Sequence, residues 1–315
     1  MSSENVSEIK DCYSDDIFKY LLSLESNAKV PKDYLQNIQP NVNEKMRAIM
    51  IDWLVSVHDR FILRYETLFL TVNVFDRYLS KVTVDRKKLQ LVGITAMLIA
   101  AKYEEMYPPD VSDYIYICES AYSRNDILNM EQNMLKVIDY SLSNPTCLHF
   151  FYVQPIISCD SINCGTAGAV SAVGNTDSIA IDKAVFNTAK YLMELALDMD
   201  SLDYLPSQIT VSAIHLAYNI IEQQMPQVLL DSALIKSHSL DDIKPCMDHL
   251  GYLLTKTNIN CSTTKDKDYC IGVKPPNVAQ KCAEVLDATR KKFARAKLMQ
   301  ISIHPKVKDY KVQTI

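Results

Sequence analysis

The stretch MRAIMIDWLVSVHDRF, residues 46–61, forms two separate apolar stripes when it is set out as an α-helix at about 100° per residue. The larger stripe consists of Met46, Ile49, Met50, Trp53, Leu54, Val57 and Phe61. The smaller stripe consists of Ala48, Ile51 and Val55, with Arg47 and His58 on one flank and Asp52 and Asp59 on the other. An ordinary surface helix has one apolar stripe. Residues 46–61 are therefore expected either to be buried on both sides or to offer one side to a partner.

The composition argues against a β protein, and the motifs argue against a catalytic or metal site. The chain has 315 residues, of which 48% are apolar, and only 6 are glycine, which argues against a loop-rich β protein or a phosphate-binding loop. The 9 cysteines never occur as CxxC, so we expect reduced thiols and no zinc site. No GxSxG, Walker A or HExxH motif is present. We therefore expect no catalytic residues, no cofactor and no metal.

The charge and the termini limit the class of partner. A net charge of −5 argues against a nucleic-acid surface along the whole chain. The N-terminal residues lack the basic and apolar regions of a secretion signal, and the longest apolar run, residues 89–101, is too short to cross a bilayer. We expect a soluble intracellular protein with no nucleic-acid or membrane partner.

Helix start and stop signals recur along the chain. An amphipathic helix is predicted over residues 14–25 with Ser14 as its N-cap, and the opening helix is predicted to start near Asn43. Ser123 and Asp126 form a capping-box pattern. Further helices are predicted at residues 66–80, 85–105, 110–119 and 124–138, and then at 146–154, 180–199, 206–223, 227–235, 240–255 and 279–298.

An internal repeat suggests a duplicated bundle. AMLIAAKY (96–103) aligns with AIHLAYNI (213–220), and in both stretches alanines recur four residues apart, which lets neighbouring helices approach closely. Chance similarity between two alanine-rich helices is the alternative. Residues 158–178 are small, polar and without period, as in an insertion, and the basic run RKKFARAK (290–297) is expected to be a solvated face rather than a nucleic-acid contact. The expected units are 1–37 (N-terminal helix and connector), 38–142 (first fold), 143–256 (second fold) and 257–315 (linker, C-terminal helix and tail).

Three motifs carry a family resemblance. MRAIMIDWLVSV, LQLVGITAMLIAAKYEEMYPP and NMEQNMLK resemble the first cyclin box of A- and B-type cyclins, in the same order and at similar separations. The resemblance continues through PTCLHF, AKYLMELALDMD and LPSQI to RKKFARAKLMQISIHP, and KYEEMYPP, YLMEL and LPSQI are typical of the B type, the mitotic cyclins. It covers nearly the whole chain and includes the box signature residues Arg47, Asp76, Leu91, Lys102 and Glu131.

The resemblance implies two tandem five-helix cyclin folds with an N-terminal and a C-terminal helix. It also implies a regulatory subunit that binds and activates a cyclin-dependent serine/threonine kinase in G2/M control, in the nucleus and cytoplasm. Arg47 and Asp76 would form an internal ion pair that ties the first helix of the box to the second. The residues expected to bind the kinase are Lys102, Glu131, Tyr103, Tyr140, Leu142, Ile17 and Tyr20.

A further expectation concerns substrate recruitment. Cyclins of these types bind Arg-x-Leu peptides of substrates or inhibitors in a shallow groove, and the resemblance assigns that groove to Met46, Ile49, Met50, Trp53, Leu89 and Gln90. Burial on both sides is the alternative for this helix. Ser56 stands where some relatives have an acid, which puts the preference for the peptide arginine in doubt.

Two other expectations stay open at this point. No Arg-x-x-Leu destruction signal precedes the first predicted helix, so either the sequence is a truncated form or turnover is controlled differently. The alternative function is a transcriptional-type cyclin or another cyclin-fold adaptor, which would bind a different kinase or none. A DNA-binding general transcription factor of cyclin fold would need a zinc ribbon and a basic surface, and the sequence has neither.

Overall fold

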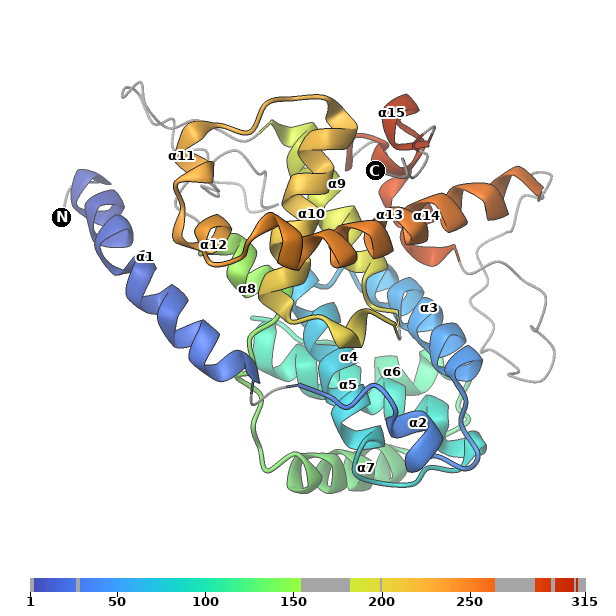
Figure 1. Cartoon of the computed structure of the whole chain (residues 1–315). Helices are drawn as coiled ribbons and strands as arrows, with labels where there is room; N and C mark the ends of the chain where they lie inside the picture. Colours follow the sequence, from blue (N-terminus) through green and yellow to red (C-terminus); the bar gives the residue numbers. More distant parts are fainter. Residues whose placement is uncertain are drawn as a thin grey trace.

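The computed structural model describes residues 3–26, 29–153, 182–198, 200–263, 287–295, 298–308 and 310, and these residues form helices and no strand. The expected all-α architecture is confirmed. Figure 1 shows two helical bundles stacked on one another, with α1 (Ser3–Glu25) along the edge of the molecule. The predicted insertion 158–178 lies outside the described residues, as do residues 279–286 of the predicted final helix.

The first bundle surrounds α5, whose sequence is apolar on nearly every side. Asn43 caps α3 by accepting a hydrogen bond from the Met46 amide at 2.9 Å, and the predicted capping box of Ser123 and Asp126 begins α7. A 3₁₀ turn, Arg86–Lys88, precedes α5. The helices of this bundle are α2 (Tyr34–Asn37), α3 (Glu44–Arg60), α4 (Tyr65–Leu79), α5 (Leu89–Glu104), α6 (Val111–Ile117) and α7 (Arg124–Val137).

The second bundle surrounds α10, the counterpart of α5 in the sequence repeat. Both α5 and α10 contact most of the other helices in their own bundles, as the close spacing of their alanines predicts. The predicted helix 227–235 is two short helices instead, because the Ser232 side chain caps a new start at Ala233. The helices of this bundle are α8 (Cys147–Tyr152), α9 (Lys183–Leu195), α10 (Pro206–Ile221), α11 (Gln227–Leu230), α12 (Ala233–Lys236) and α13 (Leu240–Thr263).

Helix α3 is buried on both sides, which explains its two apolar stripes. The larger stripe enters the core of the first bundle through Met50, Trp53, Leu54 and Val57. The smaller stripe forms a separate cluster between the bundles, made of Ile51, Val55, Leu68, Val72 and Ala288. Thus α3 belongs to the first bundle but also contacts the end of the chain.

The C-terminal segment, of which residues 287–295 and 298–308 are described, joins the two bundles. Its helix α14 (Ala288–Phe293) contacts both α3 and α9. The Asp52 carboxylate on α3 accepts a hydrogen bond from the Ala288 amide at 2.8 Å. On the other side, Lys292 Nζ lies 2.6 Å from Glu194 Oε2 on α9, and both side chains are buried. The 3₁₀ turn Ile301–Ile303 and α15 (Pro305–Lys308) continue this segment over the second bundle.

Two sequence-based expectations about the ends of the chain are wrong. Helix α1 begins at Ser3, so Ser14 lies inside it and is not its N-cap. The basic run 290–297 is not simply a solvated face, because Lys292 is buried and Arg295 lies 2.6 Å from Asp59 on α3. Lys291, Lys292 and Arg295 of this run meet carboxylates of the same chain, which periodicity alone does not reveal.

Candidate functional site

Lys102 and Glu131 form an ion pair on the surface of the first bundle. Lys102 lies in the last turn of α5 and Glu131 in the middle of α7, two helices that pack side by side. Lys102 Nζ lies 2.6 Å from Glu131 Oε1, and the two side chains are 45% and 13% exposed. An ion pair this open to solvent contributes at most about 1 kcal/mol to folding. The two groups thus order each other; Lys102 remains open to solvent, whereas the Glu131 side chain is largely covered.

The aromatic residues expected beside this pair are also exposed. Tyr103 follows Lys102, and Tyr140 lies just beyond the end of α7, where its backbone has a φ of 55°. Leu142 is half-buried against the core of the first bundle. The Arg77 guanidinium holds this turn by donating to the Ser141 carbonyl at 2.6 Å. An exposed aromatic next to ordered charges is a common composition of protein interfaces.

Ile17 and Tyr20 are exposed on α1, a helix that contacts α8 and α12 of the second bundle. Figure 1 shows α1 running outward along the edge of the molecule past these two helices. No contact between these two side chains and the Lys102–Glu131 pair is seen among the described residues. The predicted kinase-binding residues therefore lie on two parts of the molecule, the first bundle and helix α1. The position of one set relative to the other depends on the direction of α1.

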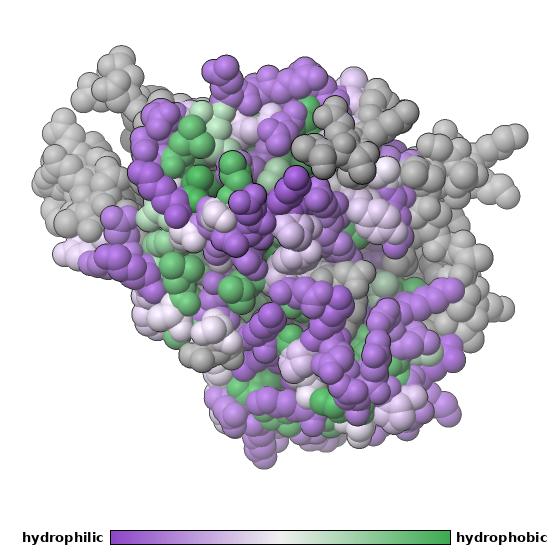
Figure 2. All heavy atoms as spheres, viewed as in Figure 1, coloured by the Kyte–Doolittle hydropathy of each residue, from purple (hydrophilic) through white to green (hydrophobic). Residues whose placement is uncertain are grey.

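Figure 2 shows one face of the molecule, on which hydrophobic residues occur in several separate groups among hydrophilic ones. Exposed aromatic and aliphatic side chains of the described residues include Tyr103, Met106, Tyr107 and Tyr140 of the first bundle. Met106 and Tyr107, in the turn after α5, add two more exposed apolar side chains close to Lys102 in the sequence. The resemblance did not assign these two residues, although the printed motif KYEEMYPP contains them.

Arg47 and Asp76 form the expected ion pair, fully buried between α3 and α4. Arg47 donates from Nε to Asp76 Oδ1 at 2.8 Å and from Nη2 to Oδ2 at 2.6 Å. The adjacent Asp76 carboxylate raises the pKa of Arg47 against the opposing effect of burial. Tyr34 donates to Asp76 Oδ1 at 2.7 Å, and Arg47 Nη1 donates to the Leu197 carbonyl of the second bundle at 3.2 Å. These last two partners could not be predicted from the sequence, because no local pattern links Tyr34 or Leu197 to the pair.

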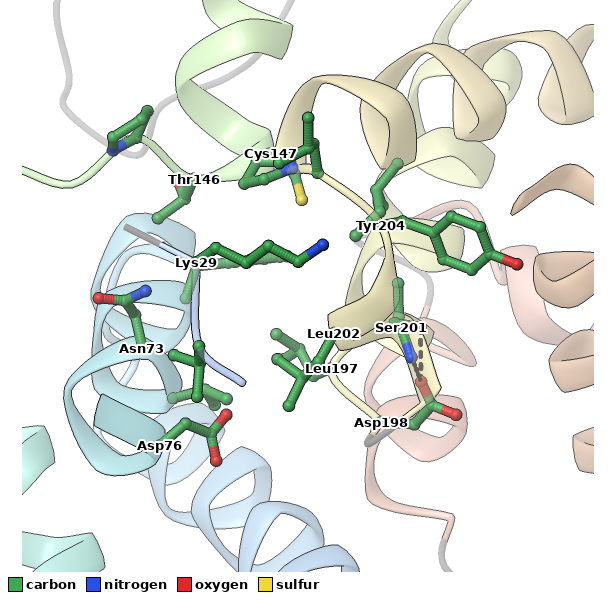
Figure 3. A pocket seen from close by; sticks show the side chains of 18 of the residues that line it. Lys29, Asn73, Asp76, Thr146, Cys147, Leu197, Asp198, Ser201, Leu202 and Tyr204 are labelled. Atoms are coloured by element: carbon green, nitrogen blue, oxygen red, sulfur yellow. Dashed lines mark hydrogen bonds between the residues drawn. The ribbon is translucent and has the colours of Figure 1, made fainter. Parts of the chain in front are cut away.

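A cavity of about 120 Å³ adjoins this pair where the two bundles meet. Figure 3 shows Asn73 and Asp76 of α4 on one side, Thr146 and Cys147 on another, and Lys29 reaching across. Space of this size accepts a few water molecules or a group about as large as benzene. The residues expected to bind a kinase do not line it.

The predicted peptide groove is wrong for two of its residues. Met50 and Leu89 are 0% exposed and belong to the core of the first bundle. Met50 is drawn inward because Gly93 of α5 leaves room for it: a Cβ on Gly93 would lie only 3.0 Å from the Met50 sulfur. Of the other four, Ile49 and Trp53 are nearly buried, and Met46 and Gln90 are half-buried.

Two buried donors remain without a partner in this region. Trp53 Nε1 and Gln90 Nε2 make no hydrogen bond with any of the residues that the structure describes. They lie on α3 and α5, which pack against each other. An unmet buried donor costs about 1–3 kcal/mol, so most buried polar groups find a partner.

The described residues contain no cluster of three or more potential metal ligands. Within the same residues, no helix has both the length and the apolar character needed to cross a membrane.

Comparison with known proteins identifies the class. The models for "Cyclin, N-terminal domain" and "Cyclin, C-terminal domain" match residues 16–143 and 145–269. The chain therefore belongs to the cyclin family. Its fold is also that of a viral cyclin from Herpesvirus saimiri, with a TM-score of 0.56 at 18% identity over 76% of this chain and 97% of that one.

Curated relatives show which type of cyclin the chain is. A G2/mitotic-specific cyclin-B of Hydra vulgaris is 41% identical over 257 residues, which are 81% of this chain and 64% of the relative. A G2/mitotic-specific cyclin-B of Marthasterias glacialis is 37% identical over 92% of this chain and 63% of the relative. A G2/mitotic-specific cyclin-B2 of Anguilla japonica is 35% identical over 94% of this chain and 64% of the relative. The chain is of the B type, and it spans less than two thirds of each of these relatives.

Proposed function

We propose that this chain is a regulatory subunit that binds and activates a cyclin-dependent serine/threonine kinase in G2/M control. The observation that carries the proposal is the ordered Lys102–Glu131 pair at the surface, with Lys102 nearly half exposed, together with the exposed aromatic residues Tyr103 and Tyr140. Its small contribution to folding does not explain why two charges are held there. A docking face needs such groups, because apolar contact is not directional and charges fix the register of the partner.

The chain would act by binding the active arrangement of the kinase more tightly than the inactive one. A kinase needs the lysine of its third strand paired with a glutamate of its mobile helix, and an ordered activation segment. A shift from about 1% to 99% active requires a difference in binding free energy of about 5.5 kcal/mol. A broad and preformed helical surface can supply this difference without adding any catalytic group to the active site.

Charge reversal tests this proposal. Lys102→Glu and Glu131→Lys should each weaken kinase binding at least about tenfold, equal to 1.4 kcal/mol, while the unfolding midpoint changes little. The double exchange Lys102→Glu/Glu131→Lys restores the internal pair, but we expect it to leave kinase binding weak. The matched control is the exposed pair of Lys236 and Asp231, 2.9 Å apart on the second bundle. Full recovery of kinase binding in the double exchange would show that the pair is only structural.

The chain is also proposed to recruit substrates or inhibitors that carry Arg-x-Leu peptides. The support is that Met46 on α3 and Gln90 on α5 are half-buried, and that Trp53 Nε1 and Gln90 Nε2 have no hydrogen-bond partner among the described residues. Trp53→Phe removes the donor and keeps an aromatic ring. It should raise the peptide Kd about fivefold to tenfold, as expected for one lost hydrogen bond of about 1–1.5 kcal/mol. Phosphorylation of a short generic peptide should be unchanged; an equal loss on both substrates would contradict recruitment through this site.

Recognition of the peptide arginine is expected to be weak. Ser56 is neutral, and its hydroxyl donates to the Asp52 carbonyl of its own helix at 3.2 Å. Replacement of the arginine in the peptide by alanine should therefore change its Kd less than replacement of the leucine does.

We further propose a location in both the nucleus and the cytoplasm, which imaging of a tagged chain would test. The alternative of a transcriptional-type cyclin is not favoured, because the relatives are mitotic cyclins. Identification of the kinase that copurifies with the chain would separate the two functions.

A further inference from the structure

Helix α1 carries two stripes with opposite environments. Phe18, Leu21 and Glu25 are buried, whereas Ile17 and Tyr20 are about half or more exposed. These two sets occupy different sides of the helix, because each set repeats at intervals of three or four residues. A rotation of α1 about its axis would redirect Ile17 and Tyr20 by the same angle. The contacts of the buried stripe thus determine where the exposed stripe points.

The apolar part of the buried stripe holds α1 against the second bundle. The Phe18 ring meets Phe150 of α8 edge to face, with ring centres 6.1 Å apart. Leu21 belongs to the same core. Such contacts favour burial but allow small shifts of rotation and register, since hydrophobic attraction has no direction. A second kind of contact is needed to fix the direction of α1.

Glu25, the last residue of α1, supplies directed contacts. Its carboxylate is 3% exposed and lies at the N-terminus of α10, a 16-residue helix. Glu25 Oε1 accepts from the Ser207 amide at 2.6 Å, and Oε2 accepts from the Ser207 hydroxyl at 2.9 Å. The amide is one of the donors that α10 itself leaves unpaired, and the helix dipole favours a negative charge there. Glu25 therefore caps a helix of the second bundle from α1.

His238, in the turn after α12, completes this network. Its Nε2 lies 3.0 Å from Ser207 Oγ. A carboxylate only accepts, so the Ser207 hydroxyl donates to Glu25 and accepts from His238 Nε2–H. Burial lowers the pKa of His238, which favours the neutral ring that this arrangement uses. The hydrogen-bond chain from His238 to Ser207 to Glu25 involves three separate elements of the fold.

The other polar links near this end of α1 are exposed. Lys32 pairs with Asp203 at 2.5 Å, with both side chains nearly half exposed. Lys29 donates to the Asp203 carbonyl at 3.3 Å, also in an exposed position. Exposed links of this kind contribute little. Glu25 is buried and makes two directed bonds, so it has the strongest claim to fix the helix.

We propose that Glu25 is a positioning residue for kinase binding: by capping α10 it sets the direction of α1 and so presents Ile17 and Tyr20 to the kinase. This inference rests on the proposed function for its second half, the link to the kinase. Its first half, the anchoring of α1, concerns this chain alone. The two halves can therefore be measured separately.

Hydrogen exchange on the full free chain tests the anchoring. In Glu25→Ala, amides of α1 from residue 13 to residue 25 should exchange at least about tenfold faster, whereas amides in the middle of α5 should keep their rates. Glu25→Gln keeps the shape and removes the charge, and it should give a smaller change in the same direction. The control is Glu222→Gln, at the opposite end of α10, where the carboxylate is exposed and pairs with Lys306 at 2.8 Å. Unchanged exchange of α1 in Glu25→Ala would overturn the proposal.

Kinase affinity tests the second half by non-additivity. Glu25→Ala should raise the kinase Kd about tenfold in the native background, equal to 1.4 kcal/mol. In the Ile17→Ala/Tyr20→Ala background, the same substitution should change the Kd less than about twofold, because the side chains that α1 presents are gone. A tenfold loss in both backgrounds would show that Glu25 acts elsewhere. Failure of the proposed function itself would look different: Lys102→Glu would not weaken kinase binding, while the exchange result for α1 would stand.

Discussion

Asp76→Ala should destabilise the first bundle severely, because it leaves the buried Arg47 guanidinium without a counter-charge. Asp76 accepts two charge-assisted hydrogen bonds from Arg47 and one from Tyr34. Loss of one partner of a buried pair costs about 3–5 kcal/mol, and the unpaired Tyr34 hydroxyl adds about 1 kcal/mol. We expect a total loss of about 4–6 kcal/mol, which is a large share of the stability of an ordinary domain.

Trp53 provides a local assay for this loss. It is the single tryptophan of the chain, and it lies in the core of the first bundle on the same helix as Arg47. Urea unfolding followed by tryptophan fluorescence therefore reports this bundle. With a slope of about 2 kcal/mol per molar urea, the midpoint should fall by about 2–3 M in Asp76→Ala.

A triple variant that replaces the whole buried network tests this reasoning. Arg47→Met, Asp76→Leu and Tyr34→Phe together remove every charge and hydroxyl of the pair and fill a similar volume. Because a buried ion pair gains little over apolar packing, the triple variant should lose less than about 2 kcal/mol. If Asp76→Ala costs less than about 1 kcal/mol, or the triple variant costs as much as the single one, the reasoning from an uncompensated buried charge is wrong.

Three further predictions concern stability. First, burial and the Lys292 ammonium lower the pKa of His58 from 6.5 to about 3, so the unfolded chain takes up a proton before the folded one does. His58 should therefore cost about 2 kcal/mol of stability as the pH falls from 6.5 to 5, and His58→Gln should flatten that part of the pH profile; parallel profiles would contradict this. Second, Lys292→Ala leaves Glu194 buried without its partner and should lower the unfolding free energy by about 3–5 kcal/mol, whereas Lys292→Met with Glu194→Leu should lose much less. Calorimetry of the three chains would check this, and equal losses would count against a buried pair. Third, Met50→Ala should cost about 2–5 kcal/mol in urea unfolding, as expected for a core methionine, and the half-buried Met46 should cost clearly less; similar costs would contradict the burial difference.

Much of the helical fold follows from local rules that the sequence states directly. Asn43 and Ser123 mark helix starts through their side chains, and these contacts are present. Alanines at four-residue spacing identified the central helices α5 and α10. The wrong start at Ser14 also comes from a local signal. A residue that can cap a helix does not start a new one where the preceding residues are already helical. Local signals predict that a helix exists better than they predict where it begins.

The candidate site was less accessible from the sequence, because burial depends on neighbours far along the chain. Met50 and Trp53 lie on the same stripe, but a glycine on α5 lets Met50 sink fully into the core. Lys292 lies in a basic run that resembles a solvated face, and only the distant Glu194 explains its burial. In the sequence, Glu25 is an ordinary acid at the end of a helix, and only the fold shows that it binds Ser207. In each case the deciding contact is a tertiary one.

The two sides of α3 show why rigidity between the bundles matters for the proposed function. The residues on α5 and α7 that we propose to bind the kinase belong to the first bundle, whereas α1 is anchored on the second. The contacts that join the bundles therefore also set the distance between the two halves of the docking face: Arg47 with the Leu197 carbonyl, and Asp52 with the Ala288 amide. If binding has to order a loose docking face, less of the binding free energy remains to shift the kinase from its inactive to its active arrangement. An α3 buried on one side only would remove part of the contact between the bundles, so its second apolar stripe supports the proposed activation by helping to hold the bundles in one arrangement.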